Sequence, residues 1–359
     1  MSQSVATLAQ TSMRAFHPLR VKRLVEETHD AKSIVFEIPP ALADAFHYRA
    51  GQFLTLEVPF QGVPLRRCYS LASSPECEAE HRVTVKRVAG GRISNWLNDN
   101  LRVGDSVSVL QPEGRFVLTN HQGPIALFGG GSGITPLIAI AKTALATTAR
   151  AVTLVYANRD ERSIIFRREL AELEQNYGGR LRIVHRLDAV QGFLGEADVR
   201  AGMAAGLATA ECYLCGPAPF METVERGLLA AGIDGARVHI ERFASLADPG
   251  APAKSSEPAP AATEGAQMPD VIEVELRGEK HLVPYVAGKK ILELVKEAGL
   301  DAPFSCEEGF CGCCTARLVE GQVTMDADDA LTADEKKKGL ILTCQSRPQT
   351  RRCSIVYVD

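Results

Sequence analysis

The stretch Cys306-Glu307-Glu308-Gly309-Phe310-Cys311-Gly312-Cys313-Cys314 decides how the C-terminal part of this chain is built. Cys306, Cys311 and Cys314 have the spacing C-x4-C-x2-C, and Cys344 follows after a hairpin-like segment. This is the plant-type ligand pattern of a [2Fe–2S] cluster, in which each iron takes two thiolates beside its bridging sulfides. Glycine inside such a loop takes positive φ angles and lets backbone amides approach the sulfurs. The spacing therefore predicts a cluster bound by four cysteines.

Two other uses of these cysteines explain less of the pattern. Buried or disulfide-bonded cysteines need no fixed spacing, and zinc sites usually consist of paired C-x2-C knuckles. The loop has one such pair unless Cys313 also serves as a ligand. We predict that Cys313 does not bind the cluster. A one-electron centre implies an electron donor, for which the candidates lie earlier in the chain.

The bulk properties narrow the class of protein. A length of 359 residues suggests two or three domains, and the net charge of −4 gives no case for nucleic acid as a partner. The cysteines outside the cluster pattern show no disulfide framework, the N-terminus has no secretory signal pattern, and no apolar run is long enough to span a membrane. We expect a cytoplasmic protein that binds neither nucleic acid nor membrane.

The changes in composition and in strand and helix patterns along the sequence predict three domains. After a disordered segment at residues 1–16, short β runs between glycines and prolines over residues 17–119 favour an antiparallel β-barrel. Over residues 120–243, apolar strands alternate with helical patterns, which is typical of an α/β domain with a parallel sheet. Residues 244–270 are rich in Ala, Pro, Ser and Glu and predict a flexible linker, with an ordered strap as the alternative. Residues 271–359 then form the cluster domain.

Two stretches in the barrel could bind a flavin. Arg67, Tyr69 and Ser70 lie on a predicted strand, where a guanidinium can neutralise a phosphate, an aromatic ring can cover an isoalloxazine and a hydroxyl can meet a flavin nitrogen. An ordinary strand with a surface arginine and a core tyrosine fits these residues too. At residues 90–97 a glycine turn enters a helix, whose free amides could hold a phosphate. Plain helix capping by Ser94 is an equally compatible interpretation.

Two stretches of the α/β domain could bind a nicotinamide coenzyme. Residues 129–133 are rich in glycine, follow a strand and open a helix, as in the dinucleotide fingerprint, although the third glycine is displaced. Cys215 ends a later strand, where a small buried residue is the default interpretation. Neither signal is specific when taken alone.

Taken together, these motifs resemble a known family. Arg67-x-Tyr69-Ser70, Gly91-x-x-Ser94-x-x-Leu97, residues 129–136 and Cys215-Gly216-Pro217 follow in the order seen in ferredoxin–NADP reductase-like flavoproteins. With the plant-type ferredoxin domain attached, the chain from about residue 16 onward resembles reductase components of multicomponent oxygenases. It is most similar to the reductases of 3-ketosteroid 9α-hydroxylases and next to those of phenylacetyl-CoA epoxidases. The resemblance implies a β-grasp fold for the ferredoxin domain and favours FAD, although FMN-using relatives exist.

The resemblance also implies roles for individual residues. Ser70 lies near flavin N5, Thr135 near the nicotinamide and the flavin, and Cys215 over the nicotinamide ring, so these three are the residues implied in hydride transfer. Phe243 lies by the flavin face, although a core phenylalanine is equally compatible. The other implied cofactor contacts are Arg67 and Tyr69 on FAD, the backbone of Val85 and Lys86 along the flavin, Gly91, Arg92, Ile93 and Ser94 on the pyrophosphate, and Gly131, Ser132, Gly133, Gly216 and Pro217 on the coenzyme.

Coenzyme choice is ambiguous in the sequence. After the predicted strand 152–156, Arg159 and Arg162 are interleaved with Asp160 and Glu161. Positive charge would suit the 2′-phosphate of NADPH, and a carboxylate would suit the ribose of NADH. The resemblance to the ketosteroid reductases favours NADH, with NADPH as the alternative.

These expectations combine into one functional hypothesis. Electrons pass from NADH through FAD and the cluster to a terminal oxygenase of the Rieske type, or alternatively of the di-iron type. A redox sensor that binds flavin and cluster without sustained turnover is a rival hypothesis. A flavohaemoglobin-type reductase is disfavoured because the sequence has no globin-like helical domain. Acidic residues near the cluster loop, namely Glu307, Glu308 and Asp326, could steer the partner or could merely solvate the loop.

Overall fold

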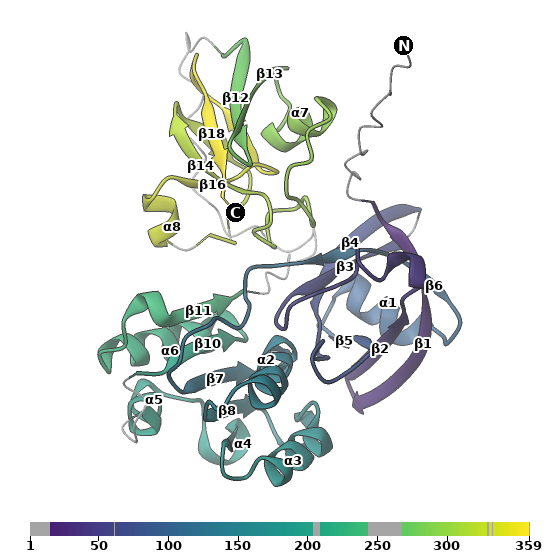
Figure 1. Ribbon diagram of the computed structural model, residues 1–359, viewed down its shortest axis with the longest axis vertical. Helices are drawn as coiled ribbons and strands as arrows, with labels where there is room; N and C mark the ends of the chain where they lie inside the picture. The colour runs from purple at the N-terminus through teal and green to yellow at the C-terminus, as the bar shows by residue number, and fades with distance from the viewer. Residues whose placement is uncertain are drawn as a thin grey trace, which may run out of the picture. The chain divides into compact units, whose positions relative to one another are not determined.

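The computed structural model describes residues 15–60, 62–203, 209–242, 268–328, 330–331 and 333–358. The chain divides into two compact units, residues 18–256 and residues 257–359 together with the first 17 residues. Phe243 and nearly all of the predicted N-terminal segment and linker lie outside the described residues. Each unit is considered by itself (Figure 1).

The first unit begins with a six-stranded antiparallel sheet in the order β4-β3-β6-β1-β2-β5. A single bridge between Leu71 and Val83 joins its two end strands, so that the sheet closes into a barrel. Alternating apolar side chains such as Leu54 and Leu56 fill its centre. The elements are β1 (His17–Thr28), β2 (Ala31–Glu37), β3 (Phe53–Phe60), β4 (Val63–Ser70), β5 (His81–Lys86), α1 (Arg92–Asn100) and β6 (Ser106–Glu113).

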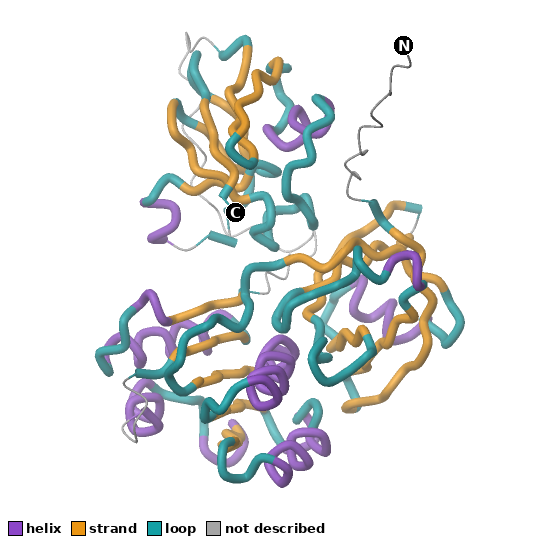
Figure 2. Tube along the Cα trace, in the orientation of Figure 1, coloured by secondary structure: helices purple, strands orange, loops and turns teal. Residues whose placement is uncertain are grey.

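A five-stranded parallel sheet follows in the order β11-β10-β7-β8-β9, with helices on its faces (Figure 2). The chain runs outward from β7 in one direction and then returns to β10, so the strand order reverses between β7 and β10. Ligands of such sheets bind at the carboxyl ends of the strands beside this switch point. The elements are β7 (Ile125–Gly130), α2 (Ile134–Thr147), β8 (Val152–Asn158), α3 (Arg167–Asn176), β9 (Leu181–Leu187), α4 (Asp188–Gln191), α5 (Glu196–Met203), β10 (Glu211–Cys215), α6 (Ala218–Ala230) and β11 (Val238–Glu241).

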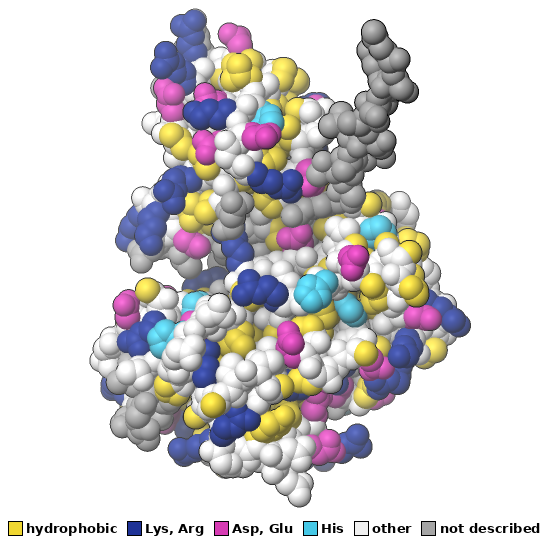
Figure 3. Space-filling model, viewed as in Figure 1, with side chains coloured by type: hydrophobic (Ala, Val, Ile, Leu, Met, Phe, Trp, Pro, Cys, Tyr) yellow, Lys and Arg dark blue, Asp and Glu magenta, His cyan; other side chains and the backbone are white. Residues whose placement is uncertain are grey.

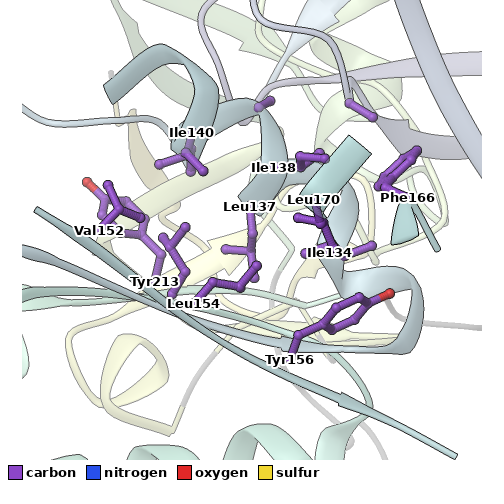
Figure 4. Packing of buried hydrophobic residues seen from close by; sticks show 14 of the residues in the cluster. Ile134, Leu137, Ile138, Ile140, Val152, Leu154, Tyr156, Phe166, Leu170 and Tyr213 are labelled. Atoms are coloured by element: carbon purple, nitrogen blue, oxygen red, sulfur yellow. The ribbon is translucent and has the colours of Figure 1, made fainter. Parts of the chain in front are cut away.

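Helix α2 is buried along almost its whole length. Ile134 and Leu137 pack in one cluster with Leu154 and Tyr156 of the sheet, as Figure 4 shows. The same cluster includes Phe116, which follows the barrel, so α2 is covered on more than one side. This burial explains why its sequence is apolar all round instead of following a helical stripe.

An ion-pair network joins the barrel to the parallel sheet. The ammonium of Lys142, on α2, is buried and lies 2.8 Å from Glu78 of the barrel and 2.9 Å from Glu169 of α3. Glu169 also accepts a hydrogen bond of 2.8 Å from Arg82 on β5. Removal of either glutamate would leave the buried Lys142 ammonium with one partner in place of two, which is unfavourable. The network therefore holds the two domains of this unit in one arrangement.

The second unit is a mixed sheet in the order β13-β12-β18-β14-β16 that packs against helix α7. Strands β12 and β18 are parallel, and their neighbours are antiparallel. Ile291 and Val295 of α7 pack in one cluster with Val274 and Ile355 of the sheet. This is the β-grasp arrangement that we expected. The elements are β12 (Val271–Leu276), β13 (Glu279–Pro284), α7 (Ile291–Glu297), β14 (Thr315–Glu320), β15 (Val323–Met325), α8 (Ala333–Lys337), β16 (Leu340–Leu342), β17 (Ser346–Pro348) and β18 (Ser354–Tyr357).

Candidate flavin, coenzyme and iron-sulfur sites

The predicted flavin residues lie on the two end strands of the barrel sheet. Arg67, Tyr69 and Ser70 are on β4, and Val85 and Lys86 are on β5. Among the described residues, these two strands are joined by one bridge, between Leu71 and Val83. Within this described part of the chain they form no further β-ladder with each other. Both groups of predicted residues therefore lie on strands that, among the described residues, meet at this one bridge.

Ser70 shows that the end of β4 suits a polar ligand. Its side chain is buried, and its hydroxyl has no hydrogen-bond partner among the described residues. A buried hydroxyl without a partner is costly unless a ligand completes it. Tyr69 is half-buried against the barrel core, and burial raises its pKa, so the phenol stays neutral. These features fit a flavin bound along β4.

The N-terminus of α1 is open for a phosphate. Gly91 occupies the N-cap position, and no side chain caps the helix. The hydroxyl of Ser94 accepts a hydrogen bond of 3.1 Å from the Val88 amide and does not cap the helix. Plain capping by Ser94, one of the two interpretations of this sequence, is therefore wrong. The first-turn amides of a helix have no intrahelical acceptor, so the segment of Gly91, Arg92 and Ile93 fits the pyrophosphate of FAD.

The predicted coenzyme loop meets the Cys215 loop by direct backbone contact. A methyl group placed on Gly133 would lie 2.0 Å from the Cys215 carbonyl oxygen, which no side chain could tolerate. Gly216 likewise approaches the backbone of Gly130. The hydroxyl of Thr135 donates a 3.0 Å hydrogen bond to the Ser132 carbonyl. The glycines thus allow the two predicted coenzyme segments to approach each other closely. The contact between Gly133 and Cys215 also explains why the third glycine of the fingerprint is displaced.

Cys215 lies at the switch point of the sheet. It ends β10 and is aligned with Gly129 of β7 on one side and Glu241 of β11 on the other. Its thiol is buried, and burial raises its pKa, so it acts as a small neutral residue and not as a nucleophile. Gly216 beside it is buried and Pro217 is exposed. This position at the carboxyl edge is where the nicotinamide was predicted to lie.

The coenzyme loop and the flavin strand approach each other at Lys86. A methyl group on Gly131 would lie 3.9 Å from the Lys86 ammonium. This ammonium is 3.7 Å from Asp30, and burial lowers its pKa. Asp30 also lies 3.2 Å from Arg159, just after β8. The structure thereby places Lys86, a predicted flavin residue, beside Gly131, a predicted coenzyme residue.

Three polar residues at this site were missed by the sequence reasoning. Asp30 lies in the turn between β1 and β2, where an aspartate is ordinary. Asn158 ends β8, is buried, and neither atom of its amide has a partner among the described residues. Glu241 is half-buried, and this burial raises the pKa of its carboxyl to about 8. The sequence held one signal for Asn158 and Glu241: each is a polar residue at the carboxyl end of a parallel strand, where ligands bind.

The four predicted cluster cysteines gather in two pairs in the second unit. The thiol of Cys306 contacts that of Cys311, and the thiol of Cys314 contacts that of Cys344. Three of the four residues are buried and Cys311 is half-buried. Two pairs of thiols side by side match a centre with two irons that each take two thiolates. The donor set therefore fits a [2Fe–2S] cluster.

Backbone amides are directed at the sulfurs. The Glu308 amide donates to Cys306 Sγ and the Cys313 amide to Cys311 Sγ, both at 3.4 Å. Glu307, with φ of 57°, and the glycines at 309 and 312 turn the loop so that these amides face inward. Cys313 thus contributes its backbone amide to the sulfur of Cys311.

Two of the acidic residues that could steer a partner are compensated by neighbouring cations. Glu307 lies 2.9 Å from Lys296, and Asp326 lies 3.2 Å from Lys290 and 2.5 Å from Arg347. Figure 3 shows positive and negative side chains interspersed over the visible face. The simple solvating role is therefore the better interpretation for Glu307 and Asp326.

Comparison with known proteins finds family models that match three successive parts of the chain. Residues 18–118 match the family model of the oxidoreductase FAD-binding domain, residues 127–226 that of the oxidoreductase NAD-binding domain, and residues 274–349 that of the 2Fe-2S iron-sulfur cluster binding domain. None of the helices in the described part of the chain is long and apolar enough to cross a membrane.

Relatives match over almost the whole length. The chain is 44% identical over 340 residues to the ferredoxin reductase component of 3-ketosteroid-9-alpha-monooxygenase from Rhodococcus rhodochrous, covering 94% of this chain and 96% of the relative. It is 33% identical to one component of the 1,2-phenylacetyl-CoA epoxidase from Escherichia coli strain K12, covering 97% and 98%. Among solved structures, phthalate dioxygenase reductase is 26% identical with a TM-score of 0.61, covering 95% and 98%.

Proposed function

Because the chain belongs to the family of FAD- and NAD-binding ferredoxin reductase components of multicomponent oxygenases, we propose that it delivers electrons from NADH to a Rieske-type ketosteroid oxygenase. It is a flavin and iron-sulfur oxidoreductase with FAD and a [2Fe–2S] cluster. The observation that carries the proposal is the 44% identity to a ketosteroid monooxygenase reductase across all three domains.

The residues of the chain bind and orient the groups that carry the chemistry. A bound flavin would supply acceptance of a hydride and release of electrons one at a time, which is the chemistry that links a two-electron coenzyme to a one-electron cluster. Arg67, Tyr69 and Ser70 on β4 would hold the flavin, and the start of α1 would hold its pyrophosphate. Gly133 and Cys215, whose backbones approach closely, would hold the nicotinamide part of the coenzyme. No step of oxygen chemistry is assigned to this polypeptide, so substrate hydroxylation belongs to the oxygenase.

The choice of NADH is supported by the charges after β8. The Asp160 carboxylate accepts hydrogen bonds from the Ser163 amide and hydroxyl at 3.0 and 2.9 Å, and Glu161 lies 3.1 Å from Arg167. Arg159, one of the two arginines after β8 that could meet a 2′-phosphate, is paired with Asp30. A 2′-phosphate would have to compete with this carboxylate, which disfavours NADPH.

We propose a cytoplasmic location and a modular organisation with domains at residues 17–119, 120–243 and 271–359, joined by a linker at residues 244–270. All ten cysteines lie within the described residues and none forms a disulfide, which suits a reducing compartment. The division of the chain into two compact units supports the separation of the C-terminal domain from the rest.

Reconstitution with purified oxygenases tests the proposal. The protein is combined with NADH and either the oxygenase component of a 3-ketosteroid 9α-monooxygenase or a di-iron phenylacetyl-CoA epoxidase, and product is quantified. We expect ketosteroid hydroxylation to proceed at least about tenfold faster than epoxidation, relative to each oxygenase with its own reductase. Support of the epoxidase alone would contradict the proposed partner. Absence of NADH oxidation with any acceptor would contradict the reductase function itself.

A further inference from the structure

A buried amide follows the last cluster cysteine. Gln345 is 4% exposed, and its Nε2 donates to Cys344 Sγ at 3.4 Å and to the Glu307 carbonyl at 3.0 Å. It therefore joins the turn that carries Cys344 to the loop that carries Cys306 and Cys311. The sequence motif gave no role to this position.

The orientation of the Gln345 amide is fixed by its hydrogen bond to Lys290, which is itself paired with Asp326. Its Oε1 accepts a 3.2 Å hydrogen bond from the Lys290 ammonium, and Lys290 is in turn held 3.2 Å from Asp326. An ammonium only donates and a carbonyl only accepts. If the amide were reversed, its NH2 group would face Lys290 and its oxygen would face the Glu307 carbonyl, so both contacts would become repulsive. The N–H is consequently directed at the sulfur.

The cluster loop is shaped to admit this side chain. Gly309 has φ of 88°, and a methyl group there would lie 2.8 Å from Gln345 Cγ. The Gly309 amide also donates to Cys344. Loop and amide thus fit as a pair, and Cys344 receives one donor from the backbone and one from a side chain.

We propose that Gln345 sets the reduction potential of the cluster through its hydrogen bond to Cys344. An added electron increases the negative charge on the ligand sulfurs, and a fixed N–H donor stabilises the more negative state. Hydrogen bonds to cluster sulfurs are one of the means by which a protein tunes such a centre. Gln345 acts on the cluster through its hydrogen bond to Cys344. The inference rests on the proposed ligation by the four cysteines.

The first test replaces the donor by a side chain of similar length. In Gln345→Met the equilibrium constant for reduction should fall about tenfold, which is ~59 mV for one electron. The midpoint is measured by redox titration followed by EPR of the reduced cluster. The matched control is Gln349→Met, which removes an amide that donates to Thr324 and not to a sulfur. An unchanged midpoint and unchanged g values in Gln345→Met, whatever happens to stability, would overturn the proposal.

A second measurement needs no change at position 345. The full-length protein is produced with glutamine labelled with ¹⁵N at the side-chain amide, reduced, and studied by pulsed EPR. A ¹⁵N coupling that persists in Gln349→Met is expected. This measurement decides the question even if Gln345→Met assembles no cluster, because a reduced cluster without ¹⁵N coupling would overturn the proposal. A wild-type protein that never shows a [2Fe–2S] signal would instead contradict the proposed ligation.

Discussion

Asp30 of the barrel and Arg159 of the nucleotide-binding domain form an ion pair, with 3.2 Å between the carboxylate Oδ2 and a guanidinium nitrogen. Asp30 is mostly shielded from solvent and Arg159 is mostly exposed. The carboxylate therefore stays in place, whereas the guanidinium could turn to another anion once the carboxylate is removed.

The first prediction follows from this pair. In Asp30→Ala, the ratio of kcat/KM with NADPH to that with NADH should rise about three- to tenfold, because Arg159 is released and a repulsive carboxylate is lost. The ratio is measured by ferricyanide reduction. Asp44→Ala, which removes an exposed aspartate elsewhere on the barrel, should leave the ratio unchanged. An equal gain in Asp30→Ala/Arg159→Ala would show that Arg159 is not the residue that binds the 2′-phosphate.

The second prediction concerns the close contact at Gly133. A methyl group in Gly133→Ala would meet the Cys215 carbonyl and push the two coenzyme segments apart. Displacement of about 1 Å at a reacting centre can cost a hundredfold in rate, so NADH-dependent flavin reduction should fall by about that factor in stopped-flow measurements. FAD content should stay near one per chain. Gly179→Ala, at an open position, is the control. Full activity in Gly133→Ala would mean that this contact is not needed.

The third prediction concerns the cluster ligands. Serine in place of Cys306, Cys311, Cys314 or Cys344 should abolish or grossly alter the visible absorbance and EPR signal of the cluster, because each thiolate completes one iron. Cys313→Ser should keep the signal, since the Cys313 backbone amide that donates to Cys311 is retained. If Cys313→Ser loses the cluster while Cys314→Ser keeps it, the assignment of ligands is wrong.

The fourth prediction tests the modular organisation. A chain that ends at residue 243 should remain a yellow flavoprotein that reduces ferricyanide with NADH, because its barrel and parallel sheet have their own buried cores. It should no longer support an oxygenase, since the cluster is missing. FAD content and both activities are measured in parallel with the intact chain. Loss of FAD from the shortened chain would show that residues 244–359 help to build the flavin site.

The fifth prediction concerns pH. The pKa of Glu241 is raised by burial to about 8, so the folded protein holds this proton more tightly than the unfolded chain does. Its contribution to stability is complete below the unfolded pKa near 4.5 and is lost as the pH rises toward 8, by at most about 1.4 kcal/mol per pH unit. Glu241→Gln should flatten the pH dependence of unfolding between pH 5 and 8, followed by flavin fluorescence. An equally steep dependence in the variant would exclude Glu241 as its source.

Local patterns in the sequence predicted much of the fold. The runs at residues 125–128 and 152–156 are apolar because both faces of a parallel sheet are covered, and they appear as β7 and β8. The cluster motif could be identified because ligand spacing within one loop is a local property. Strands β15, β16 and β17 have three residues each, too few for an alternating pattern, and they were missed.

The relationships that tune the sites were beyond prediction from the sequence. Asp30 and Arg159 are 129 residues apart in the chain, and an aspartate in a turn has an ordinary local explanation. Gln345 follows a ligand, but only the folded loop shows that its amide is directed at the sulfur. Such contacts form between segments that are distant in the chain, and a single sequence does not show which distant segments come together in the fold.

Among the described residues, one bridge between Leu71 and Val83 joins the facing edges of β4 and β5. We expect the flavin to cover these edges once it is bound. Open strand edges are templates for pairing with another chain. A cell that makes the polypeptide faster than it supplies flavin should therefore accumulate aggregates, and added riboflavin should raise the yield of folded protein. The cofactor would then assist folding, and its supply would limit the amount of folded reductase in the cell.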